Sequence, residues 1–329
     1  MKTNRGRFTF IVLSLLLVVG LLASLKSGAV PTSWEDVLSV FGGSGATEND
    51  GARRILYNIR LPRIVTGLLA GMNLALSGAI LQGILRNPLA DPGVIGITSG
   101  AGLAAMVIMI LFPTLILLVP IGAFAGASAA AFLVYGLSWQ GGLNPLRLVL
   151  AGVAVAAFFG AFNTVLAVFF PERIQGTVTW MAGGFVGRSW DDVMLILPYT
   201  VLGVGAATFA AQPLTLLGLG DDMAKTLGLR VERTRLLLLV LAALLAASAV
   251  SVAGMLAFVG LIVPHVTRLI VGGDYEDVLP NAALTGGVLI VFADTIARVI
   301  ISPAEIPVGV FMSFIGAPFF LYLLKGAGK

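Results

Sequence analysis

The chain has 329 residues, of which 58% are hydrophobic and only 11% carry a charge, and its mean hydropathy is +1.02. Soluble domains contain about 25% charged residues, so this composition excludes a soluble fold and predicts a protein embedded in the lipid bilayer. The chain has no cysteine and a single histidine, which excludes disulfides, thiolate metal sites and histidine-rich metal sites. The net charge of +4 is small and gives no reason to expect nucleic acid as a partner.

A membrane-spanning helix requires about 20 predominantly apolar residues, and ten segments of this chain meet or approach that length. We therefore predict an all-α polytopic membrane protein in which residues 1–329 form a single transmembrane domain. The predicted spans are roughly residues 8–28, 62–82, 93–112, 114–137, 146–170, 192–211, 235–253, 256–271, 280–298 and 307–325.

The first span has two interpretations. Lys2, Arg5 and Arg7 precede the apolar run 8–25, an order that is also typical of secretory signal peptides. The run is long enough to span a membrane, and no clear small-x-small cleavage site follows it. These features favour a retained transmembrane helix over a signal peptide.

An even number of spans places both termini on the same side of the membrane. The two ends of the chain are basic, and Lys and Arg accumulate on the cytoplasmic side of membrane proteins. With both termini in the cytoplasm, twelve Lys and Arg residues fall inside and eight outside. We therefore expect cytoplasmic termini.

Residues 29–60 form the longest predicted external segment, and its FGGSGATENDGA stretch is typical of a plain connector. Pro62 is then expected in the first turn of the second span. Arg60 and Arg63 flank this turn, and Arg298 lies near the outer end of another span. These arginines either extend to the lipid headgroups or receive carboxylates of a delivering protein through charge-assisted, bidentate bonds.

Two polar stretches interrupt the predicted spans on the cytoplasmic side. Residues 86–93 read RNPLADPG, and two prolines with a glycine predict a tight turn of structural character. Residues 213–235 form the second stretch, in which Asp221 suits a helix cap, Asp222 a first turn and Gly228 a C-terminal stop.

The helix predicted in this second stretch is too short to be stable alone in water. Met223 and Leu227 are four residues apart and share one face. A short helix with a small apolar face needs a surface to lie on, so the pattern favours a cytoplasmic partner and a transporter driven by that partner's energy.

Few ionisable residues lie inside the spans. Asp294 and Arg298 are spaced i and i+4, which predicts a mutual ion pair. The alternative is an autonomous, ion-coupled transporter that uses Asp294 and Glu305. His265 lies one turn from Arg268 at a predicted cytoplasmic edge, which favours an interfacial role over a proton relay or haem ligation.

The sequence contains no Walker A motif, because no Gly-Lys pair is followed by Ser or Thr. It offers no plausible nucleophile–base set either. We therefore expect no enzymatic activity in this chain and no ATP hydrolysis by it.

Several blocks together resemble the FecCD-type permeases of bacterial type II ABC importers, which transport iron–siderophores, haem or vitamin B12. They are spread along most of the chain, from residue 60 to residue 324, and their combination is highly specific. The matching blocks are RLPRIVTGLLAGMNLALSGAILQGILRNPLADPGVIGITSGAG (60–102), RLVLAGVAV (147–155), LGLGDDMAKTLGL (217–229), GMLAFVGLIVPHVTRL (254–269) and FADTIARVIISPAEIPVGVFMSFIGAPFFLYLL (292–324).

The resemblance implies ten helices per subunit in a bacterial plasma membrane and a pore between two permease subunits, identical or homologous. It implies a cytoplasmic ABC ATPase dimer, which would hold ATP and Mg, and an extracytoplasmic substrate-binding protein. It implies no cofactor or metal bound by this chain and no nucleic acid. Transport would follow alternating access, with ferric siderophores the most common substrate class and haem or cobalamin as alternatives. A structural membrane scaffold is a third hypothesis, and it leaves the short polar helix unexplained.

The resemblance also assigns residues by position. Arg60, Arg63 and Arg298 match arginines that receive acidic residues of the binding protein. Asn144, Pro145 and Leu146 match part of a cytoplasmic gate, although the small hydroxyl residues of some members are missing here. The ATPase-coupling helix corresponds to Asp221, Asp222, Met223, Ala224, Lys225, Thr226, Leu227, Gly228 and Leu229.

Overall fold

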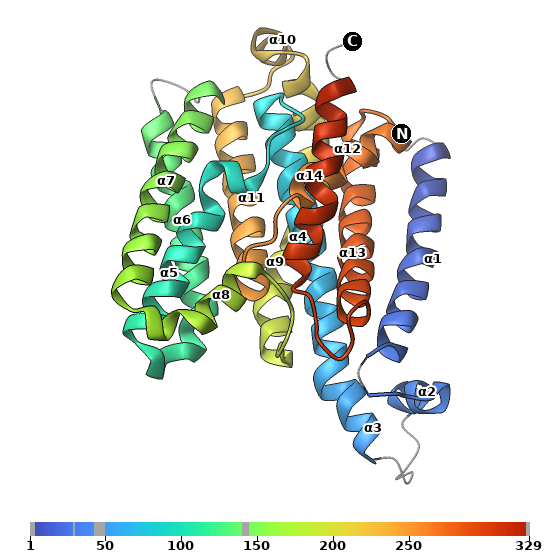
Figure 1. Cartoon of the computed structure of the whole chain (residues 1–329). Coiled ribbons are helices and arrows are strands. Elements are labelled where there is room, and N and C mark those ends of the chain that lie inside the picture. The colour runs from blue at the N-terminus through green and yellow to red at the C-terminus, as the bar shows by residue number, and fades with distance from the viewer. Residues whose placement is uncertain (1–3, 29, 43–49, 140–144, 327–329) are drawn as a thin grey trace.

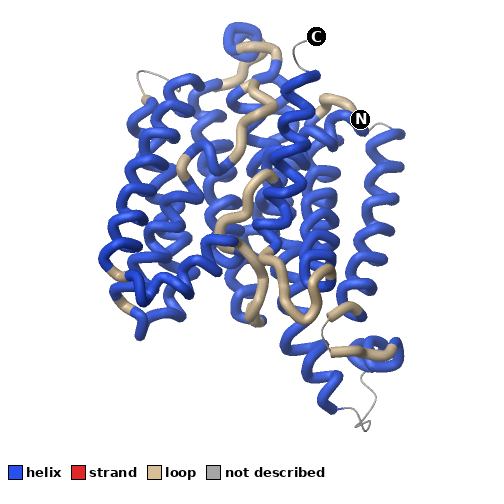
Figure 2. Tube along the Cα trace, viewed as in Figure 1, coloured by secondary structure: helices blue, strands red, loops and turns tan. Residues whose placement is uncertain are grey.

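The computed structural model describes residues 4–28, 30–42, 50–139 and 145–326, and this part of the chain contains helices and no strand (Figure 2). The elements in chain order are α1 (Asn4–Lys26), α2 (Trp34–Gly42), α3 (Asp50–Ile55), η1 (Leu56–Arg60), α4 (Leu61–Leu85), η2 (Pro92–Ile95), α5 (Ile97–Leu111), η3 (Pro113–Leu118), α6 (Val119–Ser138), α7 (Pro145–Phe169), η4 (Pro171–Arg173), α8 (Ile174–Ala182), α9 (Trp190–Gly218), α10 (Asp221–Thr226), α11 (Val231–Ala253), α12 (Val259–Val271), α13 (Tyr275–Val299) and α14 (Val308–Gly326).

All ten predicted spans are helices. Seven helices of the described chain are long and apolar enough to cross a membrane, and three shorter apolar helices, α5, α12 and α14, account for the remaining predicted spans. The start of α1, the end of α14 and α10 lie at one end of the bundle, whereas α2 and α3 lie at the other (Figure 1). The predicted all-α polytopic architecture is confirmed.

Helix α4 is the central element of the bundle. It packs against α9, α11, α12 and α13, and 83% of its apolar window is buried. Small residues allow these close approaches, because a Cβ atom at Gly78 would clash with the carbonyl group of Gly260 on α12. Polar side chains add hydrogen bonds between helices: Asn73 donates to the hydroxyl group of Ser248 at 3.0 Å.

Other helices expose apolar side chains around this centre. Only 17% of the apolar windows of α1 and α7 is buried. On α14 the side chains of Phe314 and Leu321 are 75% and 66% exposed. In water such surfaces would be unfavourable, so they are available to lipid or to another membrane subunit.

The segment between the first two spans differs from its prediction. Residues 34–42 and 50–60 are helical rather than a plain connector, and residues 43–49 lie outside the described part. Pro62 lies in the first turn of α4, as predicted, but the chain is already helical before it, from Gly51 to Leu85. A proline removes an N–H and crowds the carbonyl group one turn before it. The wide π-helical turn at η1, in which the Leu61 N–H donates to the Leu56 carbonyl group, directly precedes this position.

Candidate functional site

The short cytoplasmic helix predicted near residue 221 is present as α10. Gly220 precedes this helix with φ 103°, and Gly228 follows it with φ 85°. Both are backbone conformations that favour glycine. Met223 and Leu227 are 54% and 55% exposed, whereas Ala224 is buried. The helix therefore presents a small apolar face outward; its role in ATPase coupling stays a prediction.

The predicted boundaries of this polar segment are too wide. Helix α9 continues through Pro213 to Gly218, and α11 begins at Val231. A proline inside a helix removes one backbone hydrogen bond, and α9 is long enough to tolerate that loss. The segment outside the long helices is therefore 219–230, with α10 at its centre.

Asp221 does not cap α10, contrary to the prediction. Gly220 holds the cap position without a side-chain bond, and Asp221 is the first helical residue. Its Oδ1 atom instead accepts a hydrogen bond from Nη2 of Arg235 at 2.5 Å and forms an ion pair with Nη2 of Arg86 at 3.0 Å. Burial raises the pKa of Asp221, but the Arg235 hydrogen bond and the nearby positive charges, including Lys225, outweigh burial and lower it overall.

The predicted tight turn after α4 is confirmed. Arg86 ends α4 in the left-handed region, with φ 48°, and its N–H donates to carbonyl groups of the last helical turn. Asp91 accepts from the Gly93 N–H at 2.8 Å. Gln82, on the last turn of α4, donates at 3.2 Å to the carbonyl groups of Ala90 in the turn and Gly260 on α12. This turn is thus tied to both α4 and α12.

A second charged cluster lies at the opposite end of α4. Arg63 donates to both carboxylate oxygens of Asp294 at 2.9 and 2.8 Å, and to Glu305 at 2.8 Å. The prediction of an Asp294–Arg298 ion pair is wrong, because Asp294 pairs with Arg63 of another helix. Arg298 donates instead to the hydroxyl and carbonyl groups of Ser24 on α1, both at 2.9 Å.

Arg60 completes this cluster. It donates to the Leu25 carbonyl group at 2.5 Å and the Thr32 hydroxyl group at 2.9 Å, and also to the carbonyl groups of Lys26 and Val30. With 4%, 8% and 5% exposure, Arg60, Arg63 and Arg298 neither extend to the headgroups nor stand free. They join α1, α4 and α13, and their docking role stays a prediction.

The predicted gate residues are described only in part. Asn144 lies outside the described residues, and Pro145 is the first residue of α7. Leu146 is 68% exposed. His265 is partly buried one turn from Arg268, and its interfacial role stays a prediction. No cluster of potential metal ligands exists among the described residues.

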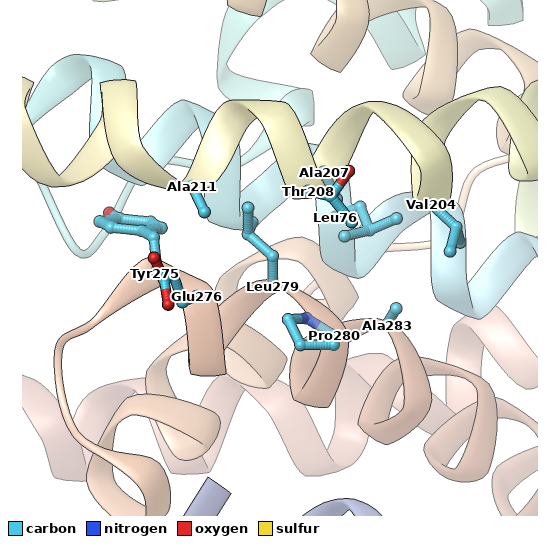
Figure 3. A pocket seen from close by; sticks show the side chains of 10 residues that line it. All are labelled: Leu76, Val204, Ala207, Thr208, Ala211, Tyr275, Glu276, Leu279, Pro280 and Ala283. Carbon is cyan, nitrogen blue, oxygen red and sulfur yellow. The ribbon is translucent and has the colours of Figure 1, made fainter. Parts of the chain in front are cut away.

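A cavity of about 280 Å³ lies between α4, α9 and α13. Side chains of α9 and α13 face each other across it, with Leu76 of α4 between them (Figure 3). Tyr275 and Glu276 contribute polar groups toward its α10 end, and no predicted site residue lines it. The lining residues are Leu76, Val204, Ala207, Thr208, Ala211, Tyr275, Glu276, Leu279, Pro280 and Ala283.

The sequence as a whole matches known permeases. Residues 16–326 match the FecCD transport family. The iron(3+)-hydroxamate import system permease protein FhuG of Bacillus subtilis is 38% identical over 99% of this chain and 99% of its own length. The cobalamin import system permease protein BtuC of Halobacterium salinarum is 46% identical over 83% and 74% of the two chains. The hemin transport system permease protein HmuU of Yersinia pestis is 39% identical over 95% and 93%.

A solved structure shares the architecture. A metal-chelate type ABC transporter, determined in an inward-facing conformation, is similar with a TM-score of 0.85 over 96% of this chain and 98% of its own chain, at 30% identity. The predicted importer permease fold is therefore confirmed together with the resemblance. This chain belongs to the FecCD transport family and is a membrane-spanning permease subunit of an ABC importer.

Proposed function

We propose that this chain, as a single permease domain over residues 1–329, forms half of the translocation pathway of an ATP-driven importer of ferric siderophores. The observation that carries the substrate class is the near full-length similarity to an iron(3+)-hydroxamate permease. Fe(3+)-citrate permeases of Bacillus subtilis at 37% and 38% identity support iron chelates as the class. The pathway alternates between outward and inward access.

The energy comes from a cytoplasmic ABC ATPase dimer, which holds ATP and Mg; this chain binds no cofactor. The exposed apolar face of α10, Met223 and Leu227, receives the ATPase. Both termini are cytoplasmic in this assignment, which agrees with α10 and the ends of α1 and α14 lying at one end. The proposed gate comprises Asn144, Pro145 and Leu146, and its described residues Pro145 and Leu146 begin α7 at the same end of the bundle as α10.

A second permease subunit, identical or homologous, covers part of the exposed apolar surface, including Phe314 and Leu321 of α14. At the opposite end of the bundle, a substrate-binding protein docks near Arg60, Arg63 and Arg298. These arginines already form hydrogen bonds within the subunit. The carboxylates of the binding protein must therefore replace those bonds or add to them. Affinity for substrate resides in the binding protein, so the permease need not hold substrate tightly.

Cobalamin is the second candidate substrate, because the relative from Halobacterium salinarum is 46% identical. Haem is the third, by similarity to the hemin permease. An ion-coupled transporter is less well supported, since both carboxylate oxygens of Asp294 accept hydrogen bonds from Arg63.

The test begins with affinity purification of this chain from its native membrane in mild detergent, followed by mass spectrometry of the proteins that accompany it. The recovered complex is then reconstituted in liposomes with ATP inside and its binding protein outside. Uptake of a ferric hydroxamate, haem and cyanocobalamin is compared. ATP-dependent uptake of the ferric hydroxamate alone supports the proposal. Uptake of cyanocobalamin or haem would assign that compound as the substrate instead. Uptake driven by an ion gradient without an ATPase would refute the ATP-driven mechanism.

A further inference from the structure

Three charged side chains meet at the first residue of α10. We propose that Arg86, Asp221 and Arg235 form a clamp that fastens α10 to the ends of α4 and α11, so that a displacement of α10 by its cytoplasmic partner also moves the end of α4. We call these three residues the α10 clamp. The inference rests on the proposed role of α10 as the ATPase-coupling helix.

Helix α10 has few attachments other than the contacts of Asp221. It has six residues, no side-chain cap and one buried residue, Ala224. A helix of this length is not stable on its own. The Asp221 carboxylate fastens it to two other elements, because one oxygen forms an ion pair with Arg86 at 3.0 Å and accepts a hydrogen bond from Arg235 at 2.5 Å.

Arg235 is the buried member of the clamp. Its side chain is 2% exposed, whereas the Asp221 side chain is 31% exposed. A buried guanidinium that loses its carboxylate partner is strongly unfavourable. Asp221 is therefore held at Arg235 when α10 is pushed, and α10 and the first turn of α11 move as one unit.

Arg86 connects the clamp to α4. It ends the central helix α4 and adopts a left-handed conformation that is uncommon for residues other than glycine. The turn 87–96 that follows is bonded to Gln82 and leads into α5. Through Arg86, a movement of α10 reaches α4 and this turn directly, rather than only through the covalent ends of α9 and α11.

The adjacent carboxylate provides a matched control. Asp222 lies on the same helix, is exposed and forms none of the ion pairs found between described residues. Asp221→Asn keeps the size of the side chain and removes the charge that binds both arginines, whereas Asp222→Asn removes a charge without a clamp. Asp221→Glu retains the carboxylate and should restore part of the function.

The experiment uses the complex of permease, ATPase and binding protein in liposomes, with whichever of ferric hydroxamate, haem or cyanocobalamin the wild type imports. We expect Asp221→Asn to retain the ATPase on purification and to hydrolyse ATP, but to import about tenfold less substrate per ATP, the size of a typical coupling between sites. Asp222→Asn measures the effect of removing a charge from the same helix without breaking these ion pairs, and the loss in Asp221→Asn should be about tenfold greater than the loss in Asp222→Asn. Equal uptake per ATP in Asp221→Asn and wild type would overturn the clamp.

A distance measurement tests the mechanism directly. The chain has no cysteine, so spin labels can be placed at Asn87→Cys and Lys225→Cys without background. With Asp221 present, we expect the distance between the two labels to be the same with and without ATP and Mg. In Asp221→Asn, we expect this distance to change when nucleotide is added. A distance that varies equally in both would exclude the clamp.

The outcomes separate the two levels of inference. If wild-type permease brings no ATPase on purification, the proposed coupling function itself fails. If Met223→Asp with Leu227→Asp releases the ATPase while Asp221→Asn transports normally, α10 couples to the ATPase and only the clamp is wrong. If Asp221→Asn only lowers the amount of protein in the membrane, ATPase activity and uptake should fall by the same factor. In that case the distance measurement decides.

Discussion

Breaking the buried ion pair between Arg63 and Asp294 should strongly destabilise its end of the bundle, because it would leave one buried charge without its partner. The two side chains are 9% and 7% exposed, and two hydrogen bonds of 2.9 and 2.8 Å join them. Two unit charges about 4 Å apart interact by about 4 kcal/mol at an effective dielectric constant of about 20. Removing one partner of such a pair typically costs about 3–5 kcal/mol.

We therefore expect Asp294→Asn to lower the free energy of unfolding by about 3–5 kcal/mol, because Arg63 keeps a buried charge without its main partner. Glu305→Gln is the matched control: it removes the other carboxylate bonded to Arg63, but this carboxylate is 30% exposed. A partly solvated pair contributes about 1 kcal/mol or less. The double variant Arg63→Met with Asp294→Leu removes both buried charges and should recover most of the loss.

The assay is unfolding of the purified permease in mixed micelles with increasing SDS, followed by the fluorescence of its four tryptophans. The same variants separate a structural from a proton-coupling role of Asp294. A free energy of unfolding of Asp294→Asn that differs from the wild-type value by less than about 0.5 kcal/mol, as expected of a neutral surface change, would refute this expectation. Stability unchanged but transport lost would favour proton coupling.

Three further changes follow from the structure. Met223→Asp with Leu227→Asp should abolish recovery of the ATPase and transport while the chain stays in the membrane, since it removes the apolar face of α10; normal uptake would contradict this. Arg60→Lys keeps the charge but loses the fork that reaches several acceptors, and should cost about 1–3 kcal/mol in the same unfolding assay; an unchanged midpoint would show that one charge suffices. Gly78→Ala should cost about 1–3 kcal/mol by overpacking against Gly260, whereas Gly160→Ala, with open space around its Cβ position, should be neutral; equal effects of both would contradict the close approach of α4 and α12.

Much of the fold could be predicted from the sequence because its signal is local. Each span is an apolar run of suitable length, and this decides that a segment is helical in lipid, where every backbone group needs a partner. Boundaries at prolines were less predictable. Pro213 suggested the end of a helix, yet it lies inside α9. Pro62 lies in the first turn of α4, as predicted, yet the chain is already helical before it, because the wide turn at η1 accommodates the missing N–H.

The short helix α10 illustrates the limit for the candidate site. Its existence, its exposed apolar pair and the stop at Gly228 follow from spacing within a few residues. The partners of Asp221 do not, because Arg86 comes from the end of α4, far away in sequence. A cap was the best local use of that carboxylate, but two guanidinium groups brought there by the fold offered it stronger, charge-assisted bonds.

The same competition explains the other cluster. The i and i+4 spacing of Asp294 and Arg298 predicts a pair on one helix, and on an exposed helix such pairs form with small gains. Here burial changes the choice: Arg63 of α4 approaches so that its planar fork binds both oxygens of Asp294. Arg298 then bonds to Ser24, which neighbours the carbonyl groups that hold Arg60. A carboxylate inside a bundle binds the donor that satisfies most of its lone pairs, and that donor is chosen by helix packing rather than by sequence spacing.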